Sequence, residues 1–539
     1  MSRTARWLLS ALLLLLLHPL GCATWTAGRR EVPSLSTKPF ASTLPLVLID
    51  ADESIGGKSP MKARMKILES SSAEHASLAA ATAAFVGEVE IQIRGSSSRR
   101  CPKKQYALSL RDAHGSARKA PLLGMPAAAD WILQGPCFDR SLIRNPLAYD
   151  LSNRLGRYAV HTRFVEAFIR ESGPKDPASH YAGVFVVMEK IARGPKHVDV
   201  AKVTDADPSG GYILRVDRGD DPHFVTARGT VIEYVDPHRP TPIQEGYLKK
   251  YFEDLESTLA GQSFADPSTG YARFLDVDSF VDHYLLNELL RNVDALRLSA
   301  YMHKDRGGKL VMGPIWDFDR SAGNIEWLAS PAGWFLPRKF KNYDPPFWWS
   351  RLLQDPSFRQ RVAQRWKALR RDTLSDASLT EAVDTKVSLI GEAAKRNFEA
   401  WPFLGIRTPP FNLDPTASPT YEGEVQELRT FLVQRARWMD GHMGTLGTGS
   451  MQQESAAAPA APPSGGGVLR SSARGARHDA QAQQNHACNC DVELGDTGHR
   501  QGPRDAGYQN DESDDVDKKS HVELLLATAR MSRPLARPA

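Results

Sequence analysis

The first half of the chain is dominated by short apolar runs and by alternation between apolar and polar residues. Residues 89–93 and 106–110 each place an apolar side chain at every second position, which is the period of a half-buried β-strand. Residues 163–169 and 181–191 are mostly apolar and rich in β-branched or aromatic side chains, which also favours strands. Residues 44 to about 235 are therefore predicted to form short strands with few helices.

One predicted helix interrupts these strands. In residues 141–155, leucines recur at spacings of four or five residues, close to the helical period. Pro146 predicts that the helix begins there, because proline lacks the amide hydrogen that a helix interior needs. The resulting order is strand, polar loop, strand, helix, strand, strand, which is also the order of a protein-kinase small lobe. Element order by itself is an analogy and identifies no activity.

From residue 240 to 442 the pattern becomes mainly helical, with one helix predicted over residues 278–290. Two strand-like segments, 297–305 and 309–318, follow this helix and are joined by an Arg-Gly-Gly turn, which predicts a hairpin. Residues 327–353 place eight aromatic side chains in a segment broken by prolines. This segment is expected either to complete the core of the helical part or to form a lid that faces a substrate.

The two ends of the chain differ from this middle part. Residues 1–23 combine two arginines with a short apolar run, which is the layout of an export signal. The sequence before Cys22 resembles the end of a bacterial lipobox, so lipid anchoring through Cys22 and ordinary cleavage after Ala23 both stay open. Residues 24–43 are predicted to be a linker. Residues 446–539 are predicted to be a disordered low-complexity tail, because they carry too little apolar area to offset the entropy of ordering.

Composition limits the classes of function. The chain has 539 residues, of which 41% are hydrophobic, enough for a folded part of roughly two or three domains. The net charge of +5 is mild, which argues against a dedicated nucleic-acid binder, since such proteins concentrate basic residues on one face. Of the five cysteines, Cys101 and Cys137 could pair in an oxidising compartment, which the sequence does not decide.

A turn of small and basic residues lies between two of the predicted strands. Residues 94–100 read Arg-Gly-Ser-Ser-Ser-Arg-Arg, and the amides, hydroxyls and guanidinium groups of such a turn suit a phosphate. A solvated hairpin tip is the alternative interpretation. By strand parity Lys104 should point inward, where its charge needs a partner, and Lys103 should point outward. A shift of one residue exchanges the two lysines.

Two aspartates flank the predicted hairpin. Asp294 follows the helix, and the hairpin can return Asp317 to the neighbourhood of Asp294. Two carboxylates brought together repel each other unless a proton or a cation lies between them, and magnesium that carries nucleotide phosphates is one such cation. In phosphoryl transfer one aspartate orients the attacking hydroxyl and a later one holds the metal. A pair of unrelated surface acids is the alternative from these residues alone.

Several blocks of the sequence together resemble the spore coat protein H (CotH) kinase family. In chain order they are "IRGSSSRRCPKKQYALSL", "SLIRNPLAYDLSNRLG", "YAGVFVVMEKI", "GGYILRVD" and "VDSFVDHYLLNELLRNVDALRLSAYMHKDRGGKLVMGPIWDFD". The resemblance covers roughly residues 45–442. It implies an α+β, atypical protein-kinase-like fold of two lobes over residues 44–442. The N-terminal lobe, about 44–190, should be rich in strands, and the C-terminal lobe, about 191–442, should be mainly helical.

The resemblance also implies an activity and a site. Members of the family are atypical protein kinases that use ATP and a divalent metal, here Mg²⁺ or Mn²⁺, to phosphorylate Ser or Thr. By correspondence Asp294 and Lys104 are expected to be catalytic, and Asp317 and Asp319 to hold the metal. The residues expected to contact the nucleotide are Arg94, Ser96, Ser98, Lys103, Lys104, Met188 and Glu189, the last two in the connector between the lobes. The expected partner is a protein with Ser or Thr hydroxyls, with no nucleic acid, at the cell envelope or outside the cell.

The sequence departs from kinase patterns at several positions. Ser96 stands where the family commonly has Asn, and Cys101 stands where an aromatic residue is usual. Ser299 occupies the place of the metal-binding Asn of ordinary kinases, and the glycine-rich and His-Arg-Asp motifs of those kinases are absent. The helix over 141–155 offers Asp150 but no Glu to pair with a lysine. A catalytically inactive pseudokinase that serves as a surface or coat scaffold, or as an adhesin, is therefore the alternative function. A glycosidase with two carboxylates is a poorer match, since no sugar-stacking groove is evident.

Overall fold

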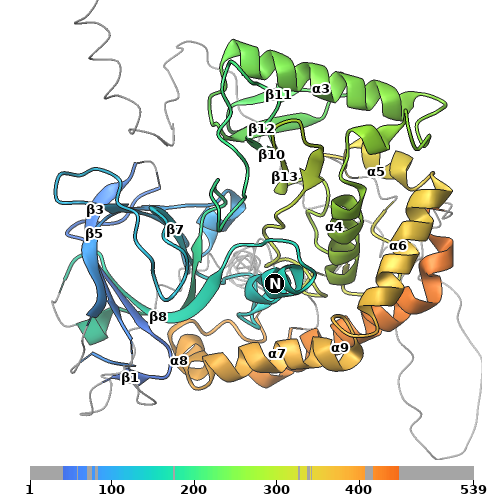
Figure 1. The fold of residues 1–539 in the computed structure, drawn as a ribbon. Helices are drawn as coiled ribbons and strands as arrows, with labels where there is room; N and C mark the ends of the chain where they lie inside the picture. The colour runs from blue at the N-terminus through green and yellow to red at the C-terminus, as the bar shows by residue number, and fades with distance from the viewer. Residues whose placement is uncertain are drawn as a thin grey trace, which may run out of the picture. The chain divides into compact units, whose positions relative to one another are not determined.

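The computed structural model describes residues 40–447, with gaps at 58, 70–75, 79–82, 174–176, 326–327, 337–339, 341–342 and 407–416. The expected export signal with Cys22, the linker up to residue 39 and the tail from residue 448 lie outside the described residues. The described part is α+β, with strands concentrated before residue 236 and helices concentrated after it (Figure 1). This confirms the predicted α+β class and the predicted order of strands and helices.

A closed β-barrel occupies the N-terminal part. Its neighbouring strands, in order around the barrel, are β2 (Leu46–Asp50), β3 (Met61–Leu68), β5 (Ala83–Ile93), β6 (Tyr106–Arg111), β7 (Asp130–Gln134), β9 (Tyr181–Glu189) and β8 (Thr162–Arg170). Alternate side chains of β5 and β6, such as Val89, Ile91 and Leu108, are fully buried in the barrel interior. Strands β1 (Ala41–Ser42) and β4 (Ala76–Ser77) form a separate two-stranded sheet.

The helix α2 (Arg144–Arg154) connects β7 to β8. It begins two residues before Pro146, so the predicted start at the proline is wrong. A proline in the first turn of a helix is tolerated, because the amide hydrogens of that turn have no partner within the helix. Almost every residue of α2 from Arg144 to Ser152 is buried, including the polar Asn145, so this short helix lies inside the protein rather than on its surface.

A second sheet is formed by strands that follow the barrel in the sequence. Its five strands, in order across the sheet, are β11 (His223–Val225), β12 (Val231–Asp236), β10 (Tyr212–Val216), β13 (Ala300–Lys304) and β14 (Leu310–Met312). The predicted hairpin is β13 and β14, but β14 ends at Met312 rather than near residue 318. Gly313, with φ 117°, and Pro314 end it, since proline cannot donate a hydrogen bond to a neighbouring strand.

The remaining elements are mainly helices. They are α3 (Pro242–Ala260), α4 (Val277–Leu290), α5 (Phe347–Leu352), α6 (Pro356–Leu369), α7 (Asp376–Ile390), α8 (Ala393–Ala400) and α9 (Tyr421–His442). Helix α3 packs against the second sheet through Phe252 and Phe224, whose ring centroids are 5.5 Å apart (Figure 1). Helix α4 is buried on nearly all sides, as expected of a central helix. Within the described residues, every helix is too short or too polar to span a membrane.

Candidate active site

Asp317 lies in an irregular segment that follows β14. Its backbone has a φ of 63°, in the left-handed region that residues other than glycine seldom adopt. The Asp317 N–H donates to the hydroxyl oxygen of Tyr149 at 3.3 Å, and the next amide, of Phe318, donates to Oδ1 of Asn145 at 2.6 Å. Nδ2 of Asn292 donates to the Asp317 carbonyl at 3.3 Å. Side chains from distant parts of the chain therefore hold the main chain of this aspartate.

Asp294 lies in the turn that follows α4. The helix ends at Leu290, and the next residue, Arg291, adopts a left-handed φ of 44°. The Asp294 N–H donates to Oδ1 of Asn292 at 3.1 Å. The Asp294 carboxylate pairs with Arg297 at 2.7 Å. The Val293 N–H donates to the Arg320 carbonyl at 3.3 Å. This bond joins the turn of Asp294 to the segment that carries Asp317 and Asp319.

Electrostatic effects show that the acids lie close together. Asp317 keeps contact with solvent, yet partial dehydration by the surrounding protein, followed by the nearby Asp294 carboxylate, raises the pKa of Asp317 to about 6. Asp319 is buried, and its burial, followed by the charge of Asp317, raises the pKa of Asp319 well above its ordinary value. The cations that oppose the shift at Asp317 are Arg94 and Arg320. The predicted convergence of Asp294 and Asp317 is present in the structure.

A further acid, Asp217, belongs to this group and was missed by sequence reasoning. It follows β10 directly, and burial raises the pKa of Asp217 above its usual range. Its Oδ2 accepts weak hydrogen bonds from the amide and hydroxyl of Ser299, at 3.3 and 3.5 Å, and its charge contributes to the raised pKa of Asp317. The signal in the sequence is the aspartate that ends "GGYILRVD". Only the pairing of β10 with β13 brings that aspartate to Ser299.

The small-residue turn also reaches the acids. Arg94 follows β5, and its N–H donates to the Gln105 carbonyl at 3.0 Å, which closes the turn. The guanidinium group of Arg94 lies 5.9 Å from the ring centroid of Trp316, the residue before Asp317. Gly95 has a φ of 104°, and a side chain there would collide with the Ser98 hydroxyl. Ser96 and Ser98 belong to the same turn, which a disulfide between Cys101 and Cys137 ties to the end of β7.

The predicted orientation of the two lysines is wrong. Lys103 is fully buried, and its Nζ donates to the Val184 carbonyl at 2.5 Å and to Oδ1 of Asn397 at 2.6 Å. Lys104 is partly exposed, and its Nζ donates to the Arg99 carbonyl at 2.6 Å. Strand β6 begins only at Tyr106, so strand parity does not extend back to either lysine. Neither lysine is among the groups that shift the pKa of Asp317.

Another lysine, Lys190, lies near Arg94. It follows β9 directly, and burial lowers the pKa of Lys190, an effect opposed by Asp130 and reinforced by Arg94. The Lys190 N–H also reaches the Asp130 carbonyl at 3.4 Å. Sequence reasoning placed Lys190 at the polar end of a strand, in the predicted connector between the lobes, and gave its side chain no role. Its neighbours show that it shares a charged environment with Arg94 of the small-residue turn.

Met188 and Glu189 lie inside β9 rather than in a connector. Met188 is buried and is paired with Ile132 on one side and Thr162 on the other. The buried Glu189 carboxylate accepts hydrogen bonds from the Tyr158 hydroxyl at 2.9 Å and the His161 amide at 3.2 Å. The predicted connector over residues 188–190 is therefore wrong for Met188 and Glu189. Strand β9 ends at Glu189, and the chain leaves the barrel at Lys190.

The acids fit a metal that is shared with phosphates better than a metal held by protein alone. Within the described ranges, no three His, Cys, Asp or Glu side chains are placed to hold a metal ion. Magnesium usually takes one or two carboxylates and completes its shell with phosphate and water oxygens. Asp317 and Asp319 provide oxygen donors of this kind, and the Asp317 side chain keeps contact with solvent, where phosphate and water oxygens could complete the shell.

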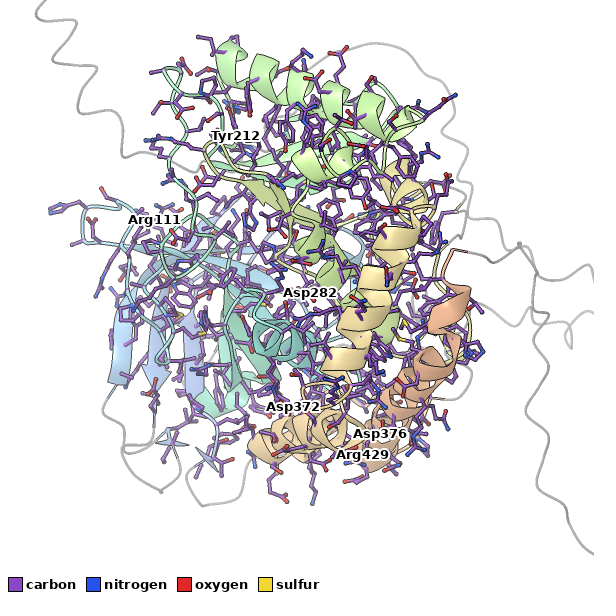
Figure 2. All side chains as sticks on the ribbon, turned by 45° about the vertical axis from the view of Figure 1, so that its right-hand side comes forward. Arg111, Tyr212, Asp282, Asp372, Asp376 and Arg429 are labelled. Atoms are coloured by element: carbon purple, nitrogen blue, oxygen red, sulfur yellow. A yellow bond between two sulfur atoms is a disulfide. The ribbon has the colours of Figure 1, made fainter. Side chains whose placement is uncertain are left out.

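A surface hollow of about 920 Å³ lies elsewhere, between α7 and α9, where Figure 2 labels Asp376 and Arg429. Asp376 in its wall pairs with Arg370 and Arg437, each at 2.7 Å. None of the predicted site residues lines this hollow. The hollow is therefore separate from the acids around Asp317.

Comparison with protein families gives one match. The family model described as CotH kinase protein matches residues 91–439, more than half of the chain. The matched range starts inside β5 and contains the small-residue turn, α2, the second sheet and all the acids described above. No curated protein matches the sequence.

Proposed function

Since the chain belongs to the CotH kinase family, we propose that it is an atypical protein kinase that transfers the γ-phosphate of ATP to a Ser or Thr hydroxyl of a protein. The observation that carries this proposal is the convergence of Asp294, Asp317 and Asp319 with Arg94. The acids come from the segments around α4 and β14, and the arginine comes from the barrel, about 200 residues earlier in the chain. A site of phosphoryl transfer needs both charges together, because it holds a metal and an anionic nucleotide.

The proposed roles follow from the surroundings of each side chain. Asp294, which is partly exposed and paired with Arg297 at 2.7 Å, would accept the proton of the attacking hydroxyl. Asp317 and Asp319 would hold Mg²⁺ or Mn²⁺. A bound divalent ion would supply positive charge to the phosphate oxygens during transfer. Arg94, with the amides and hydroxyls of Ser96 and Ser98, would bind the phosphates.

The contacts made by the lysines revise the nucleotide site. Lys103 is enclosed by β9 and α8, so we do not assign it to the nucleotide. Lys190 is the better candidate for a phosphate or ribose contact, because it shares its surroundings with Arg94. The Lys104 Nζ donates a hydrogen bond to the Arg99 carbonyl, which holds this side chain beside the small-residue turn. Lys104 would contact phosphates only from there. Adenine would lie beside the chain that begins at Lys190 rather than beside Met188 and Glu189.

The two parts of the fold would act as the two lobes of a kinase. In this proposal the barrel supplies the phosphate-binding turn, and the part after residue 190 supplies Asp217, Asp294 and Asp317. The structure differs from the expected small lobe in one respect that sequence order did not indicate. The strands close into a barrel, because β7 is inserted between β6 and β9, and β8 pairs in parallel with β2.

We propose further that the protein acts at the cell envelope or outside the cell, either anchored through Cys22 or released. The disulfide between Cys101 and Cys137 supports this location, since disulfides persist in oxidising compartments. The expected partner is a protein substrate with accessible Ser or Thr residues, and no nucleic acid is expected.

A pseudokinase scaffold or adhesin is the second candidate, and one observation favours it. Among the described residues, Asp150, the acid of α2, pairs with Arg154 of the same helix at 2.9 Å and with Lys386 of α7 at 3.5 Å, rather than with a lysine of the barrel. In ordinary protein kinases an ion pair of this kind must be in place for activity. The two candidates differ in whether phosphate is transferred.

The deciding experiment is transfer of radiolabel from ATP with Mg²⁺ or Mn²⁺, either to the protein itself or to a Ser/Thr-rich polypeptide. The protein should be prepared with its disulfide intact, beside an Asp317→Ala control. Transfer by the wild type and none by the control supports the kinase. Binding of the metal–ATP complex without transfer under any condition supports the pseudokinase.

A further inference from the structure

One face of α2 binds two consecutive amides of the metal-binding segment. Asn145 and Tyr149 are four residues apart, so they lie one above the other on the same side of the helix. Oδ1 of Asn145 accepts from the Phe318 N–H at 2.6 Å, and the Tyr149 hydroxyl accepts from the Asp317 N–H at 3.3 Å. Both side chains are almost fully buried. Their contacts are therefore shielded from competing water, which strengthens them.

These contacts define the backbone at Asp317. A φ of 63° is unfavourable for an aspartate unless neighbouring groups impose it. The two bonds from α2 hold the amides on either side of the Asp317 α-carbon, and Asn292 holds the carbonyl. The direction of the Asp317 carboxylate follows from this backbone conformation. Without the contacts from α2, the segment would relax toward ordinary φ values and the carboxylate would turn away from its present position.

Through Trp316, Tyr149 also links the segment of Asp317 to the small-residue turn that carries Arg94. Its ring stacks on Trp316 with centroids 5.9 Å apart and an interplanar angle of 19°. The Arg94 guanidinium lies 5.9 Å from the same Trp316 ring. The Tyr149 oxygen accepts from the Asp317 amide, and its own proton has no acceptor among the described residues. That proton is available to a carboxylate oxygen of Asp317 or Asp319, or to a phosphate.

We propose that Tyr149 and Asn145 are positioning residues, through which α2 orients Asp317 for metal binding by hydrogen bonds to its main chain. The inference rests on the proposed function, since it gives Asp317 the role of metal ligand. It also gives α2 a link to the site that does not depend on Asp150, which pairs with Arg154 and with Lys386 of α7. Ordinary kinases link their helix to the nucleotide through a Lys–Glu pair, whereas here the helix contacts the metal-binding segment directly.

The first test is Tyr149→Phe, which removes one oxygen atom and keeps the ring stacked on Trp316. The matched control is Tyr181→Phe. Tyr181 is also buried and donates its hydroxyl to a buried carboxylate, that of Glu166, at 2.5 Å, but it lies in β9 away from the acids. Calorimetry with Mn²⁺ and ATP should show about 10–100-fold weaker metal affinity in Tyr149→Phe, as for other groups that orient metal ligands. The control should keep wild-type affinity.

Asn145 provides the conservative comparison. Asn145→Leu removes the acceptor for the Phe318 amide, whereas Asn145→Asp keeps an oxygen in the same place. Asn145→Leu should weaken Mn²⁺ affinity at least as much as Tyr149→Phe, and Asn145→Asp should restore most of it. At saturating metal, Tyr149→Phe should recover most of its turnover. A purely structural role would instead lower thermal stability and turnover together, whatever the metal concentration.

A second readout does not depend on activity. Hydrogen–deuterium exchange of the peptide that contains residues 313–320 should be faster in Tyr149→Phe and Asn145→Leu than in the wild type or Tyr181→Phe. Wild-type exchange and wild-type metal affinity in both variants would overturn the inference. If the wild type itself binds neither metal nor ATP, the proposed function fails. In that case unchanged exchange rejects the role of α2, and faster exchange retains it as the group that orients this segment.

Discussion

Two regions of this protein place charged groups among protein atoms, and they do so in opposite ways. At Lys103 one cation is fully enclosed, and its ammonium has the Val184 carbonyl and Asn397 as acceptors. At Asp317 several carboxylates lie close together, and one of them stays open to solvent. The first region joins the barrel to α8. In the second region, Asp294 pairs with Arg297 at 2.7 Å, and Asp317 and Asp319 still repel each other.

The difference separates structural from functional use of charge. A buried charge that has all its hydrogen-bond partners stabilises one arrangement of the chain, and further ligands have no access to it. Acids that repel each other and still face solvent are costly to keep, and such groups cluster at functional sites. By this criterion Lys103 belongs to the architecture, whereas Asp317, Asp319 and Asp294 belong to the site.

The strongest challenge to this comparison is Asp317→Ala. Removal of this carboxylate should abolish both metal-dependent ATP binding and phosphate transfer, because Asp317 is the solvent-facing oxygen donor of the proposed metal site. Calorimetry with ATP and Mg²⁺, together with a transfer assay, measures both effects. If Asp317→Ala binds and transfers like the wild type, the acid cluster is vestigial and the scaffold function takes over.

Asp294→Asn should separate the two roles within the acid cluster. Its side chain keeps a similar shape but cannot accept a proton, so turnover should fall by about 10²–10⁴-fold. The affinity for ATP and Mg²⁺ should stay within a few-fold of the wild type, because Asp294 is proposed to face the acceptor hydroxyl. The calorimetric titration with ATP and Mg²⁺ measures this affinity. Complete loss of ATP binding in this variant would show that the division of labour is wrong.

At the other region, Lys103→Met should affect stability rather than the site. The variant removes the lysine donor from the Val184 carbonyl and from Oδ1 of Asn397, which then keeps only the Val184 N–H at 3.1 Å. This loss should cost about 1–3 kcal/mol in the free energy of unfolding at pH 9. Affinity for ATP and metal should be unchanged. Lys104→Met is the control and should change stability by less than about 0.5 kcal/mol, since that side chain is partly exposed. Denaturant unfolding of both variants measures this, and a selective loss of ATP affinity in Lys103→Met would place Lys103 in the site.

The smallest expected effect is a pH dependence. Burial lowers the pKa of Lys103 well below 10.5, so at pH values between its folded pKa and 10.5 the unfolded chain binds a proton that the folded chain does not. Stability should therefore rise with pH in this window. The stability lost in Lys103→Met should accordingly be larger at pH 9 than at pH 7. Unfolding curves of both proteins at the two pH values test the sign, and a difference that shrinks toward pH 9 would contradict it.

Several parts of the site could be predicted because they depend on local sequence. The alternation in residues 89–93 and 106–110 defines two strands, so the polar turn between them had to protrude. The helix before Asp294 and the hairpin before Asp317 make their convergence a consequence of chain geometry. Asp217 was missed because its approach depends on β10 pairing with β13 across more than 80 residues of sequence. Alternation within a single strand carries no information about its neighbours.

The sequence by itself determined the α+β class, the small-residue turn, the pair of aspartates around the hairpin and the family. These follow from periodicity, from residue chemistry and from blocks of local sequence. The tertiary structure alone decided which lysine is buried, where β14 ends, that Cys101 pairs with Cys137, and that α2 holds Asp317. The physical reason is the same in each case. Alternation constrains a side chain only inside a strand, whereas burial and hydrogen-bond partners outside it depend on segments that become neighbours only when the barrel closes and the second sheet assembles.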